Sequence, residues 1–136
     1  MITALDTSVL LDVLSPDPTF GPASADALRQ AIRDGSLVAC EVVWAEVSAH
    51  FPDHEAATRA LDTLGVTFSP MTAGQAVAAG RAWRGYRSRG GTRERMVADF
   101  LVGAHAVAAA DRLLTRDRGF YRSGFEGLHV LDPSRS

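Results

Sequence analysis

The hydrophobic pattern of this 136-residue chain alternates between short apolar runs and longer segments with helical periodicity. The short runs predict five strands, at residues 2–6, 37–40, 66–69, 112–115 and 128–131. Apolar positions three or four residues apart predict helices at 24–33, 41–51, 54–64, 72–87 and 94–110. Because strands alternate with helices, we expect an α/β domain with a central parallel sheet and helices on both faces.

Proline and glycine punctuate this pattern. Residues 16–22 contain three prolines and a glycine and predict a loop after the apolar segment 9–14. Ser24 is then expected to cap the next helix, and Pro52 to stop the helix over 41–51. The clearest internal break is 88–93, which is too short to separate two domains. We therefore expect one domain over residues 1–136.

Composition narrows the class of protein. Apolar residues make up 46% of the chain and charged residues 22%, as in soluble globular proteins. The single cysteine, Cys40, excludes a disulfide framework and a cysteine zinc site, and it fits a reducing cytoplasmic compartment. No apolar run reaches the roughly 18 residues of a membrane helix. The first residues lack a basic region and Asp6 interrupts their apolar run, so we expect no signal peptide.

Four carboxylates stand in apolar surroundings, where an unpaired charge is costly to bury. Asp6 ends the first predicted strand and Asp117 follows the fourth, although a helix cap and a turn residue are ordinary explanations for them. Glu46 borders the apolar face of its helix, where a boundary residue that reaches water is an equal alternative. Asp99 is the strongest signal, because it is the only full charge in the apolar segment 97–110.

These four acids are expected to converge. The carboxyl ends of parallel strands lie at one edge of a sheet, which is where ligands bind in open α/β folds. Converged carboxylates raise one another's pKa values, and a divalent cation relieves that repulsion. Ligands that are all oxygen point to Mg²⁺ or Mn²⁺, and such sites serve phosphoryl chemistry.

Three segments carry a resemblance to a known family. They are LDTSVLLDVL at 5–14, VVWAEVSAHF at 42–51 and ADFLVGAHAVAAADRLLTRDRGF at 98–120. The sequence resembles PIN-domain ribonucleases, and more narrowly VapC-type toxins of type II toxin–antitoxin pairs. By this resemblance the family's acidic positions fall on Asp6, Glu46, Asp99 and Asp117, with Asp6, Asp99 and Asp117 as metal ligands. Thr7, Ser8 and Thr115 match hydroxyl positions that support the metal.

The resemblance implies a Mg²⁺-dependent endoribonuclease, with Mn²⁺ as a possible substitute, that is cytoplasmic and dimeric. It also implies inhibition by a cognate antitoxin, and an antitoxin arginine would be the natural plug for an acidic groove. The net charge of −2 excludes a generally basic nucleic-acid binder. Arginines nevertheless gather at 81–95 and 112–122. Solvated helix faces explain most of them, but Arg116 and Arg118 bracket Asp117 and are candidates for contacting RNA phosphates.

Other functions fit the residues less well. A receiver-like phosphoryl-transfer domain needs a lysine at its site, and the chain has none. A haloacid-dehalogenase-type phosphatase would have an acid at position 8, where Ser8 stands. A PIN-fold binding module without a toxin role remains as an alternative, although all four acids are present.

Several further residues are expected to be structural. His50 and His54 have a metal-like spacing, but Pro52 lies between them and breaks the helix. His105 is expected in the core, Trp44 in the core or at an interface, and Cys40 is expected to be inert. Asp111 is expected to be a solvated turn acid that could be mistaken for another ligand. Asp12 is either solvated or a neighbour of the site, and we favour the former.

Overall fold

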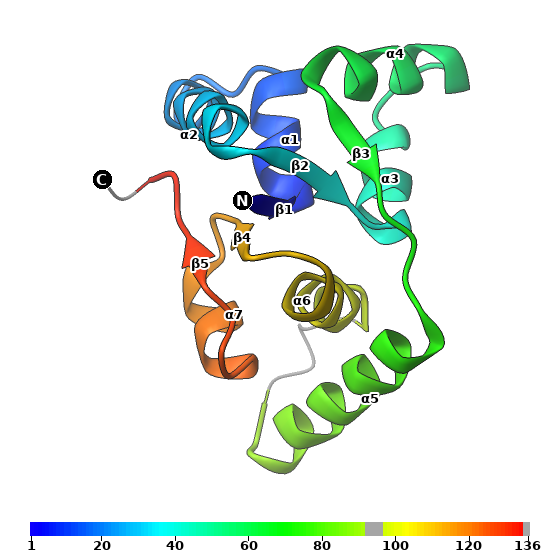
Figure 1. The fold of residues 1–136 in the computed structure, drawn as a ribbon, viewed down its shortest axis with the longest axis vertical. Helices are drawn as coiled ribbons and strands as arrows, with labels where there is room; N and C mark the ends of the chain where they lie inside the picture. The colour runs from blue at the N-terminus through cyan, green and yellow to red at the C-terminus, as the bar shows by residue number, and fades with distance from the viewer. Residues whose placement is uncertain (92–96, 135–136) are drawn as a thin grey trace.

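Five short parallel strands form the centre of the molecule in the computed structural model, which describes residues 1–91 and 97–134 (Figure 1). They are β1 (Ile2–Leu5), β2 (Ser36–Ala39), β3 (Val66–Phe68), β4 (Arg112–Leu114) and β5 (Val130–Leu131). Their order is β3-β2-β1-β4-β5, with Ala4 paired to Val38 on one side and to Leu113 on the other. The first strand therefore lies in the middle of the sheet.

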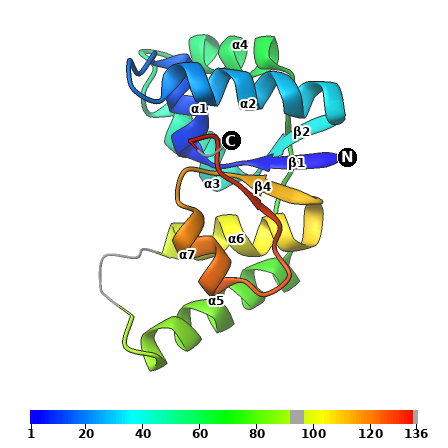
Figure 2. The same ribbon diagram turned by 90° about the vertical axis from the view of Figure 1, so that its left-hand side faces the viewer.

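Helices cover both faces of this sheet. They are α1 (Thr7–Leu14), α2 (Gly21–Asp34), α3 (Glu41–Ser48), α4 (His54–Leu64), α5 (Ala73–Ser88), α6 (Val97–Ala109) and α7 (Arg118–Gly124). Helices α1, α2 and α4 lie on one side of the sheet, and α5, α6 and α7 lie on the other (Figures 1 and 2). The predicted three-layer α/β architecture is confirmed.

The core lies on both sides of β1 and β4. Leu5, Leu113 and Leu114 are completely or almost completely buried. Below the sheet, the Phe100 ring contacts Phe120 edge-on, with centroids 5.2 Å apart. These contacts hold β4 and the start of α6 in place, and both elements lead into the candidate site.

Local structure departs from the sequence prediction in four places. Ser24 is not a helix cap: α2 begins at Gly21, and Ser24 is buried inside it. The reason is that Pro22 sits in the first turn, where a missing N–H costs nothing. Helix α3 ends at Ser48, before Phe51. Residues 9–14, expected only as an apolar segment, belong to helix α1. Helix α7 was not predicted at all; its anchors Phe120 and Tyr121 are buried.

The structure describes only part of the predicted helix 94–110. Residues 94–96 of the predicted helix 94–110, together with Arg93, lie outside the described residues. Within residues 1–91 and 97–134, no helix is long and apolar enough to cross a membrane.

Candidate functional site

The site begins where β1 and β4 end side by side. The Asp6 amide donates a hydrogen bond to the Leu114 carbonyl at 3.0 Å, which continues the pairing of the two strands. The Thr115 hydroxyl donates to Asp6 Oδ2 at 2.6 Å, while Oδ1 accepts from the Thr7 amide at 2.8 Å. Asp6 therefore caps α1 with one oxygen and faces β4 with the other. Asp6 is therefore both the N-cap of α1 and, as predicted, the residue at the carboxyl end of β1.

Helix α3 supplies the next carboxylate. Val43 and Val47 are buried on its inner side, which leaves Glu46 on the flank of the helix. The Thr7 hydroxyl donates to Glu46 Oε1 at 2.7 Å. Because Thr7 directly follows Asp6, this bond ties α3 to the same edge of the sheet.

Two further carboxylates come from the start of α6 and from the residue before α7. Asp99 lies in the first turn of α6. Asp117 precedes α7, and its amide donates to the Thr115 hydroxyl at 3.0 Å. All four predicted acids border one open hollow of about 430 Å³, which we call the acidic hollow. Its lining residues are Asp6, Thr7, Ser8, Glu46, Asp99, Arg116 and Asp117.

The gathered charge perturbs Asp6. The pKa of Asp6 is raised to about 6, chiefly by burial and to a smaller extent by the nearby charges of Asp99 and Glu46. Hydrogen bonds from Thr115 and Thr7 act in the opposite direction and lower it. Burial and the neighbouring charges together therefore outweigh the hydrogen bonds that favour the ionised carboxylate.

The donor set fits a hard divalent cation in its chemistry. Every acidic and hydroxyl side chain that lines the hollow offers oxygen, as Mg²⁺ and Mn²⁺ prefer. The Ser8 Oγ atom is buried and has no hydrogen-bond partner, so it is an oxygen still able to bond. Within residues 1–91 and 97–134, however, no three His, Cys, Asp or Glu side chains are already placed to hold one metal ion together.

The two candidate phosphate contacts differ in position. Arg116 lines the acidic hollow, whereas Arg118 lies in α7 outside its lining. The Arg116 guanidinium is bound to Asp12 by two hydrogen bonds, of 2.7 and 3.1 Å. It also stacks over the Phe20 ring, 4.1 Å from its centroid.

The preference for a solvated Asp12 was wrong. Asp12 is 4% exposed, and its carboxylate pairs with Arg116 and accepts from the Ser24 hydroxyl at 2.8 Å. The sequence held a signal for this, because Asp12 is an acid among apolar residues, as Asp99 is. Its partners could not be identified, since Arg116 is 104 positions away.

The remaining expectations concern residues away from the hollow. His105 is buried and its Nε2 bonds to the Ser69 hydroxyl at 2.9 Å, as expected of a core histidine. Pro52 separates α3 from α4, so His50 and His54 do not share a helix. Asp111 is exposed at the opposite edge of the sheet, where it accepts from the Ile2 amide.

The aromatic and thiol side chains singled out from the sequence also have structural surroundings. Cys40 is buried, and burial raises the pKa of its thiol, in keeping with an inert cysteine. Trp44 is half-buried and meets Phe68 edge-on, with ring centroids 5.2 Å apart.

Comparisons with solved structures show where else this fold occurs. A chain of VapBC2 from Rickettsia felis, bound to a promoter DNA fragment, matches with a TM-score of 0.76 at 18% identity, over 97% of this chain and 98% of that one. A chain of FitAcB from Neisseria gonorrhoeae matches with a TM-score of 0.71 at 20% identity, over 100% of both chains. VapC20 of Mycobacterium tuberculosis, described as a sarcin–ricin loop cleaving toxin, matches at 0.57 and 18% identity, over 93% of this chain and 98% of that one.

Sequence comparison gives the family. No curated protein sequence matches the chain significantly. The sequence model of the PIN domain, in contrast, matches residues 3–126, which include all four acids of the hollow. The chain therefore belongs to the PIN domain family.

Proposed function

We propose that this protein is the toxin of a type II toxin–antitoxin pair and a metal-dependent endoribonuclease. The observation that carries the proposal is the convergence of Asp6, Glu46, Asp99 and Asp117 on one hollow at the carboxyl edge of the sheet. These acids come from four different elements of the fold. Burial raises the pKa of Asp6, and a carboxylate with a raised pKa in such a hollow is typical of a functional site.

Nucleases of the PIN family generally use divalent metal ions. In this chain Asp6, Asp99 and Asp117 would hold Mg²⁺ or Mn²⁺, with hydroxyl support from Thr7, Ser8 and Thr115. A bound divalent ion would activate water and stabilise the leaving oxygen of a phosphodiester. Because the carboxylates are not yet placed as a ligand group, their side chains would turn toward the ion as it binds.

An RNA substrate requires cations near this acidic site. Arg116 borders the hollow and supplies one. A second source is α5, where Arg81, Arg84 and Arg87 are exposed and no acidic residue occurs over Ala73–Ser88. Phosphates of a bound strand would be attracted to these side chains, and the affinity would fall as salt increases.

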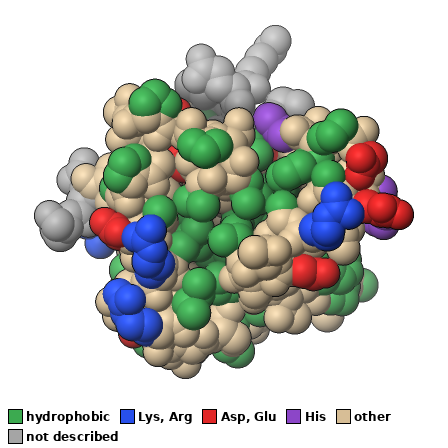
Figure 3. Space-filling model, turned by 90° about the horizontal axis from the view of Figure 1, so that it is seen from above, with side chains coloured by type: hydrophobic (Ala, Val, Ile, Leu, Met, Phe, Trp, Pro, Cys, Tyr) green, Lys and Arg blue, Asp and Glu red, His purple; other side chains and the backbone are tan. Residues whose placement is uncertain are grey.

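An antitoxin is the expected protein partner. Similar solved chains come from toxin–antitoxin complexes, including one from Klebsiella pneumoniae. On this chain, apolar side chains gather in the middle of the face that α2 and α4 border, with charged side chains around them (Figure 3). We propose that an apolar antitoxin segment lies on this face.

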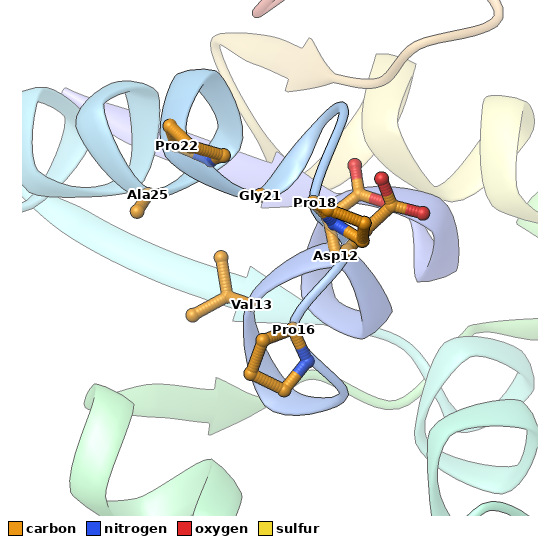
Figure 4. A pocket seen from close by; sticks show the side chains of 8 residues that line it. Asp12, Val13, Pro16, Pro18, Gly21, Pro22 and Ala25 are labelled. Atoms are coloured by element: carbon orange, nitrogen blue, oxygen red, sulfur yellow. The ribbon is translucent and has the colours of Figure 1, made fainter.

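A second hollow, of about 610 Å³, lies beside α1 and the start of α2 (Figure 4). Its lining residues are Asp12, Val13, Pro16, Asp17, Pro18, Gly21, Pro22 and Ala25. Asp12 lines this hollow and binds Arg116, which lines the acidic one, so the two hollows are neighbours. An antitoxin segment could therefore place an arginine among the site carboxylates.

Inhibition by such a plug has a direct test. The co-purified complex should cleave RNA far more slowly than the free chain, because antitoxin and RNA would occupy the same hollow. Equal cleavage rates for complex and free chain would contradict occlusion, whatever RNA the toxin cuts.

We also expect a two-fold homodimer in the cytoplasm. The alanine-rich helices α5 and α6 offer a surface for close packing, where Val77 and Val107 are 55% and 47% exposed. Light scattering should give twice the mass of one chain. A Val107→Asp variant should shift the protein toward the monomer, and a monomeric unmodified protein would contradict the dimer.

The proposed activity is tested by sequencing RNA ends after induced expression. Cells that express the protein should accumulate new 5′ ends at a small set of sites, and cells that express Asp99→Asn should not. A second candidate function, a PIN-fold binding module without cleavage, is favoured by the absence of a preassembled metal-ligand group among the described residues. That function predicts identical RNA ends in both cultures.

A further inference from the structure

Arg116 is held at the rim of the acidic hollow by contacts on one edge and one face of its guanidinium. Its Nε donates to Asp12 Oδ2 at 2.7 Å, and its Nη2 donates to Asp12 Oδ1 at 3.1 Å. The Phe20 ring lies under the guanidinium at 4.1 Å. Asp12 is itself fixed, because it is buried on α1 and accepts a hydrogen bond from Ser24 on α2. The restraint thus comes from the α1–α2 unit.

This arrangement places a cation beside four carboxylates without pairing it to them. Arg116 precedes Asp117 in the chain and lines the hollow together with Asp6, Glu46 and Asp99. A long, flexible arginine in that position is attracted to those carboxylates, and a guanidinium among them would compete with a metal ion for the same oxygens. The described hydrogen bonds of Arg116 all go to Asp12 instead.

We propose that Asp12 is a positioning residue that holds Arg116 out of the acidic hollow and so keeps the site carboxylates available to a divalent cation. The inference rests on the proposed function, since it assumes that the hollow binds metal. Asp12 has no place in the lining of the acidic hollow and acts only through Arg116. The pair has a second consequence: Nη1 donates no hydrogen bond to any described residue, so it stays available to a substrate phosphate.

Two roles for Asp12, stabilising the fold or restraining Arg116, predict different results for the double variant. If Asp12 only stabilises the fold, removal of Arg116 as well does nothing to restore function. If Asp12 restrains Arg116, the harm done by Asp12→Asn comes from the released guanidinium. Removal of that guanidinium then restores the metal site.

The experiment is titration calorimetry with Mn²⁺ alone on the full chain, after treatment with chelator and dialysis. Asp12→Asn should weaken Mn²⁺ binding about tenfold or more, the usual size of an effect from outside the ligand shell. The double variant Asp12→Asn/Arg116→Ala should return the affinity to near that of the unmodified protein. The matched control is Asp34→Asn, which removes a comparable pair, Arg112–Asp34 at 2.8 Å, from the opposite edge of the sheet. Its affinity should not change.

A milder variant covers the case in which Asp12→Asn does not fold. Phe20→Leu removes the aromatic face under Arg116 and keeps the ion pair, so Mn²⁺ binding should weaken by about two- to fivefold. The proposal is overturned if Asp12→Asn binds Mn²⁺ as the unmodified protein does, or if the double variant binds no better than Asp12→Asn. If the unmodified protein binds no Mn²⁺, both this inference and the proposed metal site fail. If only the variants disagree, the proposed function stands.

Discussion

The two ends of β4 each carry an arginine that pairs with an aspartate, but their surroundings differ. At the amino end, Arg112 donates to Asp34 at 2.8 Å and to the Thr3 hydroxyl at 2.9 Å. The Arg112 guanidinium holds the pKa of Asp34 below its ordinary value. The carboxyl end has a similar pair, Arg116 with Asp12, but the hollow beside it contains four more carboxylates.

The two edges of the sheet differ in how well hydrogen bonds satisfy their carboxylates. At the amino edge, hydrogen bonds from Arg112 and Gln30 satisfy Asp34, and the Ile2 amide donates to Asp111. At the carboxyl edge, hydrogen bonds to Asp6 only partly offset burial and the neighbouring charges, so the pKa of Asp6 rises to about 6. A buried carboxylate with a raised pKa, in a hollow that three further acids line, is typical of a binding or catalytic site.

The largest effect is expected on cell growth, where a variant at the carboxyl edge should differ from a variant at the amino edge. Asp99→Asn keeps the size of the side chain and removes the charge that would bind metal. Expression of the unmodified protein should arrest growth, and Asp99→Asn should abolish the arrest through a loss of cleavage larger than about 100-fold. Asp34→Asn should remain toxic. Equal toxicity of a folded Asp99→Asn variant would remove Asp99 from the site.

Metal binding should stabilise the carboxyl edge. A ligand that binds only the native state at one hundred times its Kd adds about 2.7 kcal/mol. For a domain of this size that corresponds to a rise in Tm of roughly 10 °C. Differential scanning calorimetry with saturating Mg²⁺ or Mn²⁺, in buffer free of chelator, should show this rise for the unmodified protein and for Asp34→Asn. An unchanged Tm for the unmodified protein would contradict a metal site.

The raised pKa of Asp6 predicts how the stability of the metal-free protein depends on pH. Asp6 ionises near 3.8 in the unfolded chain and near 6 in the native protein. Between these values the native state binds more protons, so the free energy of unfolding should fall as pH rises from about 4 to about 6. The loss should be about 2 kcal/mol, allowing for the partial exposure of the site.

Urea unfolding at several pH values, with chelator present, measures this dependence. Asp6→Asn should flatten the fall, because it removes the titrating group. Asp34 has the opposite sign: its lowered pKa contributes stability that is lost as pH decreases. A fall of the same size in Asp6→Asn would show that another group is responsible.

The smallest effect is expected at Asp111, which the sequence alone could confuse with a metal ligand. Its Oδ2 accepts from the Ile2 amide at 2.6 Å, at the amino edge of the sheet. Asp111→Asn keeps a carbonyl oxygen for that bond, so it should cost less than about 1 kcal/mol of stability. Its Tm response to Mn²⁺ should equal that of the unmodified protein, and loss of the response would place Asp111 in the site.

The strands and the helices with strong periodicity were predictable from the sequence, whereas the short helices α1 and α7 were not. Local apolar spacing is enough to place α4 and α5 within a residue or so of their ends. Helix α7 has only seven residues, two of them glycine, so its helical form depends on the burial of Phe120 and Tyr121. The contacts that bury these two side chains join distant parts of the chain, so no local pattern of apolar residues predicts them.

The candidate site also has features that the local sequence predicts and features that depend on long-range contacts. Asp6, Glu46, Asp99 and Asp117 were predicted as site residues because each is an acid in apolar surroundings, and all four line one hollow at the carboxyl edge of the sheet. Asp12 has the same signal and was misjudged, because its partners are set by the packing of α1 against α2 and the loop after β4. Sequence identifies an anomalous charge, and the tertiary structure decides whether a cation satisfies it.

The most direct test of the functional claim is cleavage of a defined single-stranded RNA mixture by purified, antitoxin-free protein. The protein is first stripped with chelator, and Mg²⁺ or Mn²⁺ is then added back to the unmodified chain, Asp99→Asn and Asp34→Asn. We predict no cleavage in chelator and site-selective cleavage on return of metal by the unmodified chain and Asp34→Asn only. Cleavage that persists in chelator, or that Asp99→Asn performs at the unmodified rate, would contradict a metal-dependent site at the carboxyl edge.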